Sequence, residues 1–234
     1  MVAKGPVQLP LWLQLREDAT LENFVDQGNE LAVASVRGLW QPQAEQFLYL
    51  WGSTGAGVSH LLQAACHLAG KAGRAAVYLP MAELADYPVA LLENLDQLDL
   101  VCLDDIQVIA TNPAWQEGVF HLFNRLREQQ KPLLVGASMP PRQLPLSLAD
   151  LQSRLSWGMV LQLQQLDDNG RLQALKLHAH ARGMDLPDEV ARFILSRAPR
   201  GSRALLAVLE KLDDASFAAK RKLTIPFVKT TLGW

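Results

Sequence analysis

Short apolar segments alternate with helical patterns in the first part of the sequence. The apolar segments span residues 46–52, 74–80, 99–106 and 131–138, and the helical patterns span residues 58–73, 81–98 and 114–130. Continuous apolar strands joined by helices are typical of a parallel sheet that is covered on both faces. With one further strand expected within residues 160–166, this part of the chain is predicted to be an α/β core.

The alternation stops at the turn sequence LDDNGR, and four helical patterns follow it. They span residues 171–184, 186–198, 202–221 and 224–232. Residues that often begin or end helices stand at their boundaries, namely Gly183, Pro187, Ser202, Thr224 and Pro226. The sequence therefore predicts three parts: an N-terminal arm at 1–19, an α/β core at 20–166 and a small all-helical domain at 167–234.

A glycine-rich turn joins the first strand of the core to its first helix, in LYLWGSTGAGVSHLLQAAC. Backbone N–H groups of such a turn form a nest for phosphate groups, and Gly52, Gly55 and Gly57 are the residues that would shape it. Val58 stands where the lysine of a phosphate loop would reach the terminal phosphates, an interaction worth about 1.5–3 kcal/mol. The sequence thus predicts a nucleoside diphosphate site with slow or absent hydrolysis of its own.

Two adjacent acids end the strand within residues 99–106. In a phosphate-loop protein the first acid, Asp104, would hold Mg²⁺ together with the hydroxyl of Ser59, and Asp105 would polarise a water molecule. Ser138 ends the next strand along the chain, where its hydroxyl can orient a water molecule or a phosphate, although a strand-end hydroxyl without such a role fits the pattern equally well.

Charge and composition limit the classes of partner. The 234 residues include 22 basic and 24 acidic ones, so no global field draws the protein to nucleic acid or to an anionic membrane. Contact with DNA is expected only indirectly, through a partner protein. Cys66 and Cys102 lie in apolar segments and are predicted to be buried thiols, which favours a reducing cytoplasm. No apolar run is long enough to cross a bilayer.

Five segments carry a family resemblance: ENFV, GSTGAGVSH, CLDDIQ, LQSRLSWGM and GSRALLAVLEKLD. In this order and spacing, they resemble the AAA+ module of the bacterial replication initiator DnaA, from Thr20 onward. The sequence ends where the DNA-reading domain of DnaA would follow. This end, together with RKLTIPFVKTTL near it and an N-terminal QLPLWL, makes the chain more similar to the Hda-like branch, whose members inactivate the initiator. Hda-like proteins also depart from the strict loop at the lysine.

The resemblance implies roles for individual residues. Phe24 and Val25 would line the pocket for the base of a nucleotide. The expected nucleotide is ADP, although these two residues do not determine which base is preferred. Arg203 would be the sensor arginine of the lid, and Arg154 the arginine finger that acts on the nucleotide of a neighbouring protein. The phosphates would be wrapped by Gly52, Ser53, Thr54, Gly55, Ala56, Gly57, Val58, Ser59 and His60, with Asp104, Asp105 and Ser138 at the metal and γ-phosphate.

The N-terminal QLPLWL resembles the short motif by which bacterial proteins bind the sliding clamp of DNA polymerase III. Gln8 would be its polar anchor, and Leu9, Leu11 and Leu13 its apolar anchors. An extended arm in which proline fixes φ can place alternate side chains in surface pockets at modest entropic cost. The alternative is an apolar arm that packs on its own domain.

The resemblance implies a regulator that is held on a DNA-loaded clamp and stimulates ATP hydrolysis by DnaA. Three alternatives remain at this point. A helicase-loader-like AAA+ ATPase would need a working loop, which Val58 disfavours. A clamp-bound scaffold would leave Arg154 without a role, and a small-molecule phosphotransferase would need a substrate site that the sequence does not display. AAA+ modules often self-associate, and the sequence does not determine whether this one does or in what number.

Overall fold

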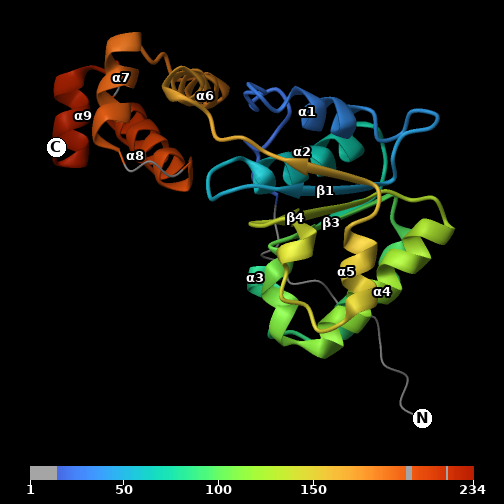
Figure 1. Cartoon of the computed structure of the whole chain (residues 1–234). Helices are drawn as coiled ribbons and strands as arrows, with labels where there is room; N and C mark the ends of the chain where they lie inside the picture. Colours follow the sequence, from blue (N-terminus) through green and yellow to red (C-terminus); the bar gives the residue numbers. More distant parts are fainter. Residues whose placement is uncertain (1–14, 199–201, 220) are drawn as a thin grey trace.

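The computed structural model describes residues 15–198, 202–219 and 221–234. Its core is a parallel five-stranded sheet in the order β2-β3-β4-β1-β5 (Figure 1). The strands are β1 (Phe47–Trp51), β2 (Ala76–Pro80), β3 (Leu100–Asp104), β4 (Leu133–Ala137) and β5 (Met159–Gln162). The predicted α/β class is therefore confirmed, including the additional strand within residues 160–166, which begins one residue earlier.

Helices cover both faces of this sheet (Figure 1). One face carries α1 (Glu30–Arg37) and α2 (Val58–Lys71), and the other carries α3 (Met81–Leu84), α4 (Pro113–Glu128) and α5 (Ala149–Leu155). Successive residues of β1 serve the two faces in turn: Leu48 and Leu50 pack towards α2, and Tyr49 packs towards α4. Because both faces are covered, β1 is apolar along its whole length.

The segment 81–98 differs from the prediction of a mostly helical region. Only α3 is an α-helix, and two short 3₁₀ turns follow it, η1 (Val89–Leu92) and η2 (Leu95–Gln97). Pro88 separates α3 from η1, because a proline lacks an N–H group and disfavours the helical conformation of the residue before it. Asn94, with φ of 63°, separates η1 from η2. The leucines of this segment nevertheless pack into the core beneath the sheet.

The second domain consists of helices with a core of their own, as predicted. They are α6 (Asp168–Ala181), α7 (Asp188–Arg197), α8 (Ser202–Ala219) and α9 (Ile225–Leu232). Gly183 follows α6 with φ of 73°, and Pro187 immediately precedes α7. Thr224 caps α9, since its Oγ1 accepts a hydrogen bond from the N–H of Phe227, 3.4 Å away. Ser202 is the first residue of α8 rather than the residue before it. This helical domain is called the lid below. Figure 1 shows the lid beside the carboxyl ends of the strands, where the glycine-rich turn follows β1.

The two cysteines lie side by side in the core of the α/β domain. Cys66 on α2 and Cys102 on β3 are free and buried, with their sulfur atoms 3.6 Å apart, as expected for thiols without a bridge. Burial raises the pKa of the Cys102 thiol and keeps it protonated. Within the described ranges, no helix has the length and apolar character needed to span a membrane.

A methyl group at Gly136 is expected to destabilise the core. Its Cβ would lie 2.5 Å from Oδ1 of Asp104 and 2.6 Å from Cδ1 of Leu62, inside strand β4. Overpacking of this kind costs about 1–3 kcal/mol. Gly136→Ala should therefore lower the free energy of unfolding, measured by urea denaturation. Gly70→Ala is the matched control, because nothing lies within 4 Å of the added Cβ on helix α2. Equal stability of the two variants would contradict this packing.

Candidate functional site

The glycine-rich turn between β1 and α2 has the backbone of a phosphate nest. Gly55 and Gly57 have φ of 89° and 97°, which L side chains rarely adopt. At Gly52 a Cβ would approach the Cβ of Ala56 to 2.8 Å, so this position also has no room for a side chain. Gly57 precedes the first residue of α2, Val58. The turn therefore directs backbone N–H groups and a helix N-terminus towards one point, where an anion is favoured.

A cavity of about 460 Å³ lies over this turn. Most residues that the sequence predicted for nucleotide binding line it: Phe24, Val25, Gly52, Ser53, Thr54, Gly55, Ala56, Gly57, Val58, Ser59, His60, Asp104, Asp105 and Ser138. The lid closes it from the other side with Arg171, Leu175 and His178. The sequence carries no signal for a nucleotide-site role of these lid residues, because their contribution depends on how the lid sits against the core.

Aromatic side chains form one wall of the cavity. The ring of Phe24 meets the ring of His60 edge to face, with centroids 5.3 Å apart, and His60 meets His178 in the same way at 5.6 Å. Phe24 also lies against the turn, because its Cε2 would be 2.8 Å from a Cβ on Gly57. This wall connects the segment before α1, the first turn of α2 and the lid helix α6.

Asp104 is held at the end of β3 by hydrogen bonds. The hydroxyl of Tyr78 donates to its Oδ2 over 2.7 Å, and the N–H of Asp105 donates to its Oδ1 over 2.9 Å. Burial raises the pKa of the Asp104 carboxyl, and hydrogen bonds from Ser59 and Tyr78 act in the opposite direction. Tyr78 had no signal in the sequence beyond its place in an apolar strand. Its position beside Asp104 follows from the parallel pairing of β2 with β3.

A glutamine connects the other two polar residues at this edge. Nε2 of Gln107 donates to Oδ1 of Asp105 over 2.8 Å, and Oε1 of Gln107 accepts from the backbone N–H of Ser138 over 3.2 Å. Asp105 itself has φ of 54°, in the left-handed region. Asp104, Asp105 and Ser138 thus lie on adjacent strand ends around the cavity, with Gln107 as a bridging residue that the sequence reasoning missed.

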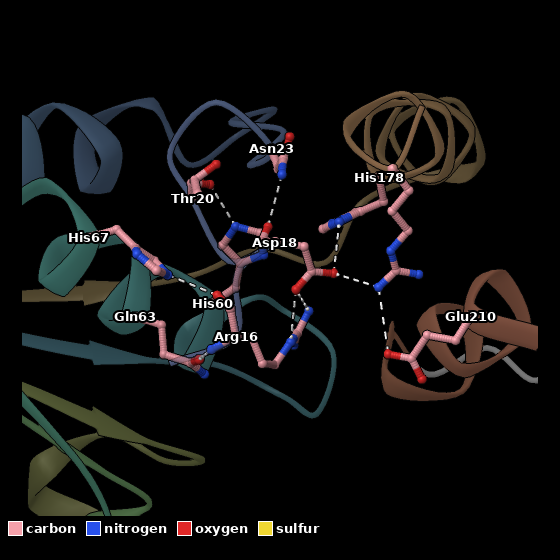
Figure 2. Close-up of polar contacts among 10 residues, drawn as sticks. Arg16, Asp18, Thr20, Asn23, His60, Gln63, His67, His178 and Glu210 are labelled. Atoms are coloured by element: carbon pink, nitrogen blue, oxygen red, sulfur yellow. Dashed lines mark hydrogen bonds and ion pairs between the residues drawn. The ribbon is translucent and has the colours of Figure 1, made fainter. Parts of the chain in front are cut away.

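A partly exposed ion cluster joins the lid to the segment before α1 (Figure 2). Asp18 is its centre: Oδ1 accepts from Arg16 over 3.0 Å, and Oδ2 accepts from Nη2 of Arg182 over 3.1 Å. Nδ1 of His178 is 3.5 Å from Oδ2, and Glu210 of α8 is 3.6 Å from Arg182. His178 above all, and then Arg16, hold the pKa of Asp18 well below its ordinary value, against the effect of burial.

The same segment is attached to α2 through its backbone (Figure 2). Nε2 of His60 lies 2.8 Å from the carbonyl oxygen of Thr20, and Nε2 of His67 lies 2.8 Å from that of Arg16. The N–H of Arg16 donates to Oε1 of Gln63 over 2.9 Å. Helix α2 begins at the phosphate turn, so the segment from residue 16 to residue 20 contacts both the helix that carries the turn and the lid.

The cavity wall predicts a pH dependence of stability. Burial lowers the pKa of His60 to about 4, so the folded protein binds fewer protons there than the unfolded chain does. The lowered pKa of Asp18 acts in the same direction, but its contribution to stability is lost only below its ordinary pKa of 3.8. Stability is thus expected to fall as the pH drops from about 6.5 towards 4, with about 1–3 kcal/mol due to His60. Urea unfolding at a series of pH values measures this. His60→Gln, which keeps a donor for Thr20, should flatten the slope, and an unchanged slope would contradict the assignment.

Arg154 lies away from the cavity, on α5. Its Cζ is 4.1 Å from the centroid of the Trp157 ring, and its Nη1 is buried without a hydrogen-bond partner. Cζ of Arg127, at the end of α4, is 4.5 Å from the same centroid. Trp157 is 42% exposed. The sequence marked Arg154 alone, since the stacking depends on the approach of α4 to α5.

Two groups of predicted residues fall outside what the structure describes. Gln8, Leu9, Leu11 and Leu13 precede residue 15, and the side chain of Arg203 is not among those described. Among the described residues, no group of three or more histidine, cysteine, aspartate or glutamate side chains is arranged to hold a metal ion. A Mg²⁺ ion that keeps several water ligands needs fewer protein ligands than that.

Comparison with known proteins identifies the family. The sequence-family model of the bacterial DnaA ATPase domain matches residues 15–162, and the family model of the Hda lid domain matches residues 168–232. AMPPCP-bound DnaA from Aquifex aeolicus has a TM-score of 0.71 and 28% identity, over 87% of this chain and 68% of that chain. Domain III of Thermotoga maritima DnaA has a TM-score of 0.78 over 94% of this chain and 98% of that chain, and at 22% identity it shows the fold alone. The chain therefore belongs to the bacterial DnaA ATPase domain family and is an Hda/DnaA-like AAA+ protein.

Proposed function

We propose that this protein is a negative regulator of replication initiation, which presents Arg154 to the nucleotide of DnaA and stimulates its hydrolysis. One observation carries the proposal: Arg154 is partly exposed away from the protein's own cavity and has no ion-pair partner among the described residues, while the phosphate turn of that cavity lacks its lysine. A finger stabilises the charge that develops on a phosphoryl group of another molecule, so it requires no hydrolysis at its own site.

The cavity is proposed to bind a nucleoside diphosphate, with ADP as the expected ligand. The related DnaA structure holds AMPPCP, which supports a nucleotide at this position. The turn supplies N–H groups for the inner phosphates, whereas Val58 leaves the terminal phosphate without its cation. Phe24 and Val25 would contact the base, and Arg203 would reach the phosphates from the lid. Bound nucleotide would then hold the core (20–166) and the lid (167–234) together.

Ser59 and Asp104 suit a Mg²⁺ ion that is bound mainly by phosphates and water. Asp104 is a buried carboxylate with a hydrogen-bonded serine beside it, the donor set that Mg²⁺ takes in nucleotide sites. When present, the ion neutralises phosphate charge. Tyr78 and the backbone of Asp105 hold the Asp104 carboxylate in place for it.

Calorimetric titration tests the nucleotide proposal. ADP and the triphosphate analogue AMPPCP are expected to bind with similar affinity, and adenosine much more weakly, because the turn recognises the inner phosphates. Binding of AMPPCP that is far tighter than that of ADP would contradict the argument from Val58, and so would equal binding of adenosine and ADP. Repeating the titration with cytidine and guanosine diphosphates determines the base preference, which apolar contact with Phe24 leaves open.

The arm at 1–19 is proposed to bind the sliding clamp through Gln8, Leu9, Leu11 and Leu13. The regulator would then contact DNA only indirectly, through the clamp, and would act in the cytoplasm. The motif resemblance supports this role. Changing Gln8 and Leu11 together to alanine should abolish retention on immobilised clamp, while the affinity for ADP stays the same. Unchanged retention would remove the clamp from the proposal without affecting the role of Arg154.

A further inference from the structure

The guanidinium of Arg154 rests on an aromatic platform. Its Cζ lies 4.1 Å from the centroid of the Trp157 ring, a distance at which a cation is attracted to the face of an indole. Nη1 is buried without a partner, and no carboxylate within the described ranges forms an ion pair with Arg154. The ring is therefore the main feature that fixes the direction of this side chain.

Trp157 is itself held firmly by the backbone. Its N–H donates to the carbonyl oxygen of Arg154 over 3.0 Å, at the end of α5. Gly158 follows with φ of 64°, and a Cβ there would lie 2.6 Å from the carbonyl oxygen of Phe47. The next residue, Met159, begins β5 and pairs with β1. The indole thus projects from a turn that is attached to the sheet, and 42% of its surface remains exposed.

A second cation shares the ring. Cζ of Arg127 lies 4.5 Å from the same centroid, and Arg127 is exposed at the last turn of α4. Among the described residues, Arg127 has no carboxylate partner either. Two guanidinium groups close to one ring repel each other, and an incoming polyanion would relieve that repulsion. The chemistry that matches this surface is a phosphate chain presented by a partner.

We propose that Trp157 is a positioning residue for Arg154: its ring holds the guanidinium in the orientation in which the partner's phosphates meet it, and Arg127 adds a second positive charge to the same surface. The inference rests on the proposed function of Arg154. A long side chain that is already oriented loses less conformational freedom when it meets the phosphoryl group in the transition state, which acts on the rate rather than on the affinity. Removal of the ring should therefore reduce the maximal stimulated rate, and the concentration needed for half-maximal stimulation should change little.

The test compares Trp157→Leu with Trp157→Phe in the complete hydrolysis assay with ATP-loaded DnaA, clamp and DNA. Trp157→Leu should lower the maximal stimulated rate about 3- to 30-fold, the range expected for loss of a cation–π contact. Trp157→Phe keeps a π face and should recover most of that loss. In the Arg154→Ala background, Trp157→Leu should have no further effect. Thermal melts followed by circular dichroism confirm that each variant is folded.

The outcomes separate this inference from the proposed function. If Arg154→Ala abolishes stimulation but Trp157→Leu matches the wild type, the positioning role is wrong and the finger remains. The positioning role is also wrong if Trp157→Leu raises only the half-maximal concentration, because Trp157 would then be a docking contact. If Arg154→Ala has no effect, both proposals fail. Arg197→Ala is the matched control, because it removes an arginine stacked on Phe193 in the lid, 5.5 Å from the ring centroid.

Discussion

Replacing Arg154 by alanine is expected to reduce the stimulated hydrolysis of DnaA-bound ATP to its unstimulated rate. In related enzymes an arginine finger contributes about 10³–10⁵ in rate, so the whole stimulation should be lost. Single-turnover hydrolysis of radiolabelled ATP bound to DnaA measures the effect. The fold should tolerate the change, because Arg154 contacts a ring that is already partly exposed and makes no ion pair with the described residues.

Two further variants sharpen this result. Arg154→Lys keeps the positive charge but loses the planar fork that binds two phosphate oxygens together, so it should recover only a small part of the rate. Arg197→Ala in the lid should stimulate normally. If Arg154→Ala stimulated as well as the wild type, the protein would act by a route that does not involve a finger, such as the scaffold alternative.

Replacing Val58 by lysine is expected to increase the affinity for a nucleoside triphosphate by about 10- to 100-fold. The ammonium group would restore a charge-assisted contact worth about 1.5–3 kcal/mol at the terminal phosphate. Affinity for the diphosphate should rise less, since its phosphates already lie within reach of the turn. Titration of AMPPCP and ADP into the two proteins measures the difference.

The matched control is Val58→Met, which adds length without charge. Val58 already lies close to the strand ends, because its Cγ1 and Oδ1 of Asp104 would both approach a Cβ on Gly136, at 2.9 Å and 2.5 Å. The side chain of a lysine at this position would start close to the Asp104 carboxylate. Its positive charge would lower the pKa of Asp104 and so oppose the effect of burial. If Val58→Lys bound AMPPCP no more tightly than Val58→Met, the missing lysine would not be the reason for a diphosphate preference.

The parts of the fold that depend on local chemistry could be predicted from the sequence. The apolar runs of β1, β3 and β4 are buried on both faces, and their short length and their alternation with helical patterns predict strands. The phosphate turn could be predicted because the backbone of Gly55 and Gly57 requires glycine. The prediction of a mostly helical segment at 81–98 was wrong. Its buried leucines have the spacing of a helix, but Pro88 and Asn94 interrupt the backbone.

Contacts between distant elements could not be predicted in this way. Asp18, His178 and Arg182 are joined only because the lid lies against the segment before α1. Tyr78 reaches Asp104 through strand pairing, and Arg127 reaches Trp157 through the packing of α4 on α5. In each case one residue has an ordinary place in the sequence and acquires its role from a neighbour more than twenty positions away. Periodicity carries no information about such pairs.

The most direct test of the central claim is hydrolysis of ATP by DnaA in the presence of this protein, the sliding clamp and DNA, with each component omitted in turn. The account predicts a rise in hydrolysis only when all components are present, and almost none from this protein with ATP alone. Rapid magnesium-dependent hydrolysis by the isolated protein would contradict the account, since the turn that contains Val58 would then be a working ATPase site.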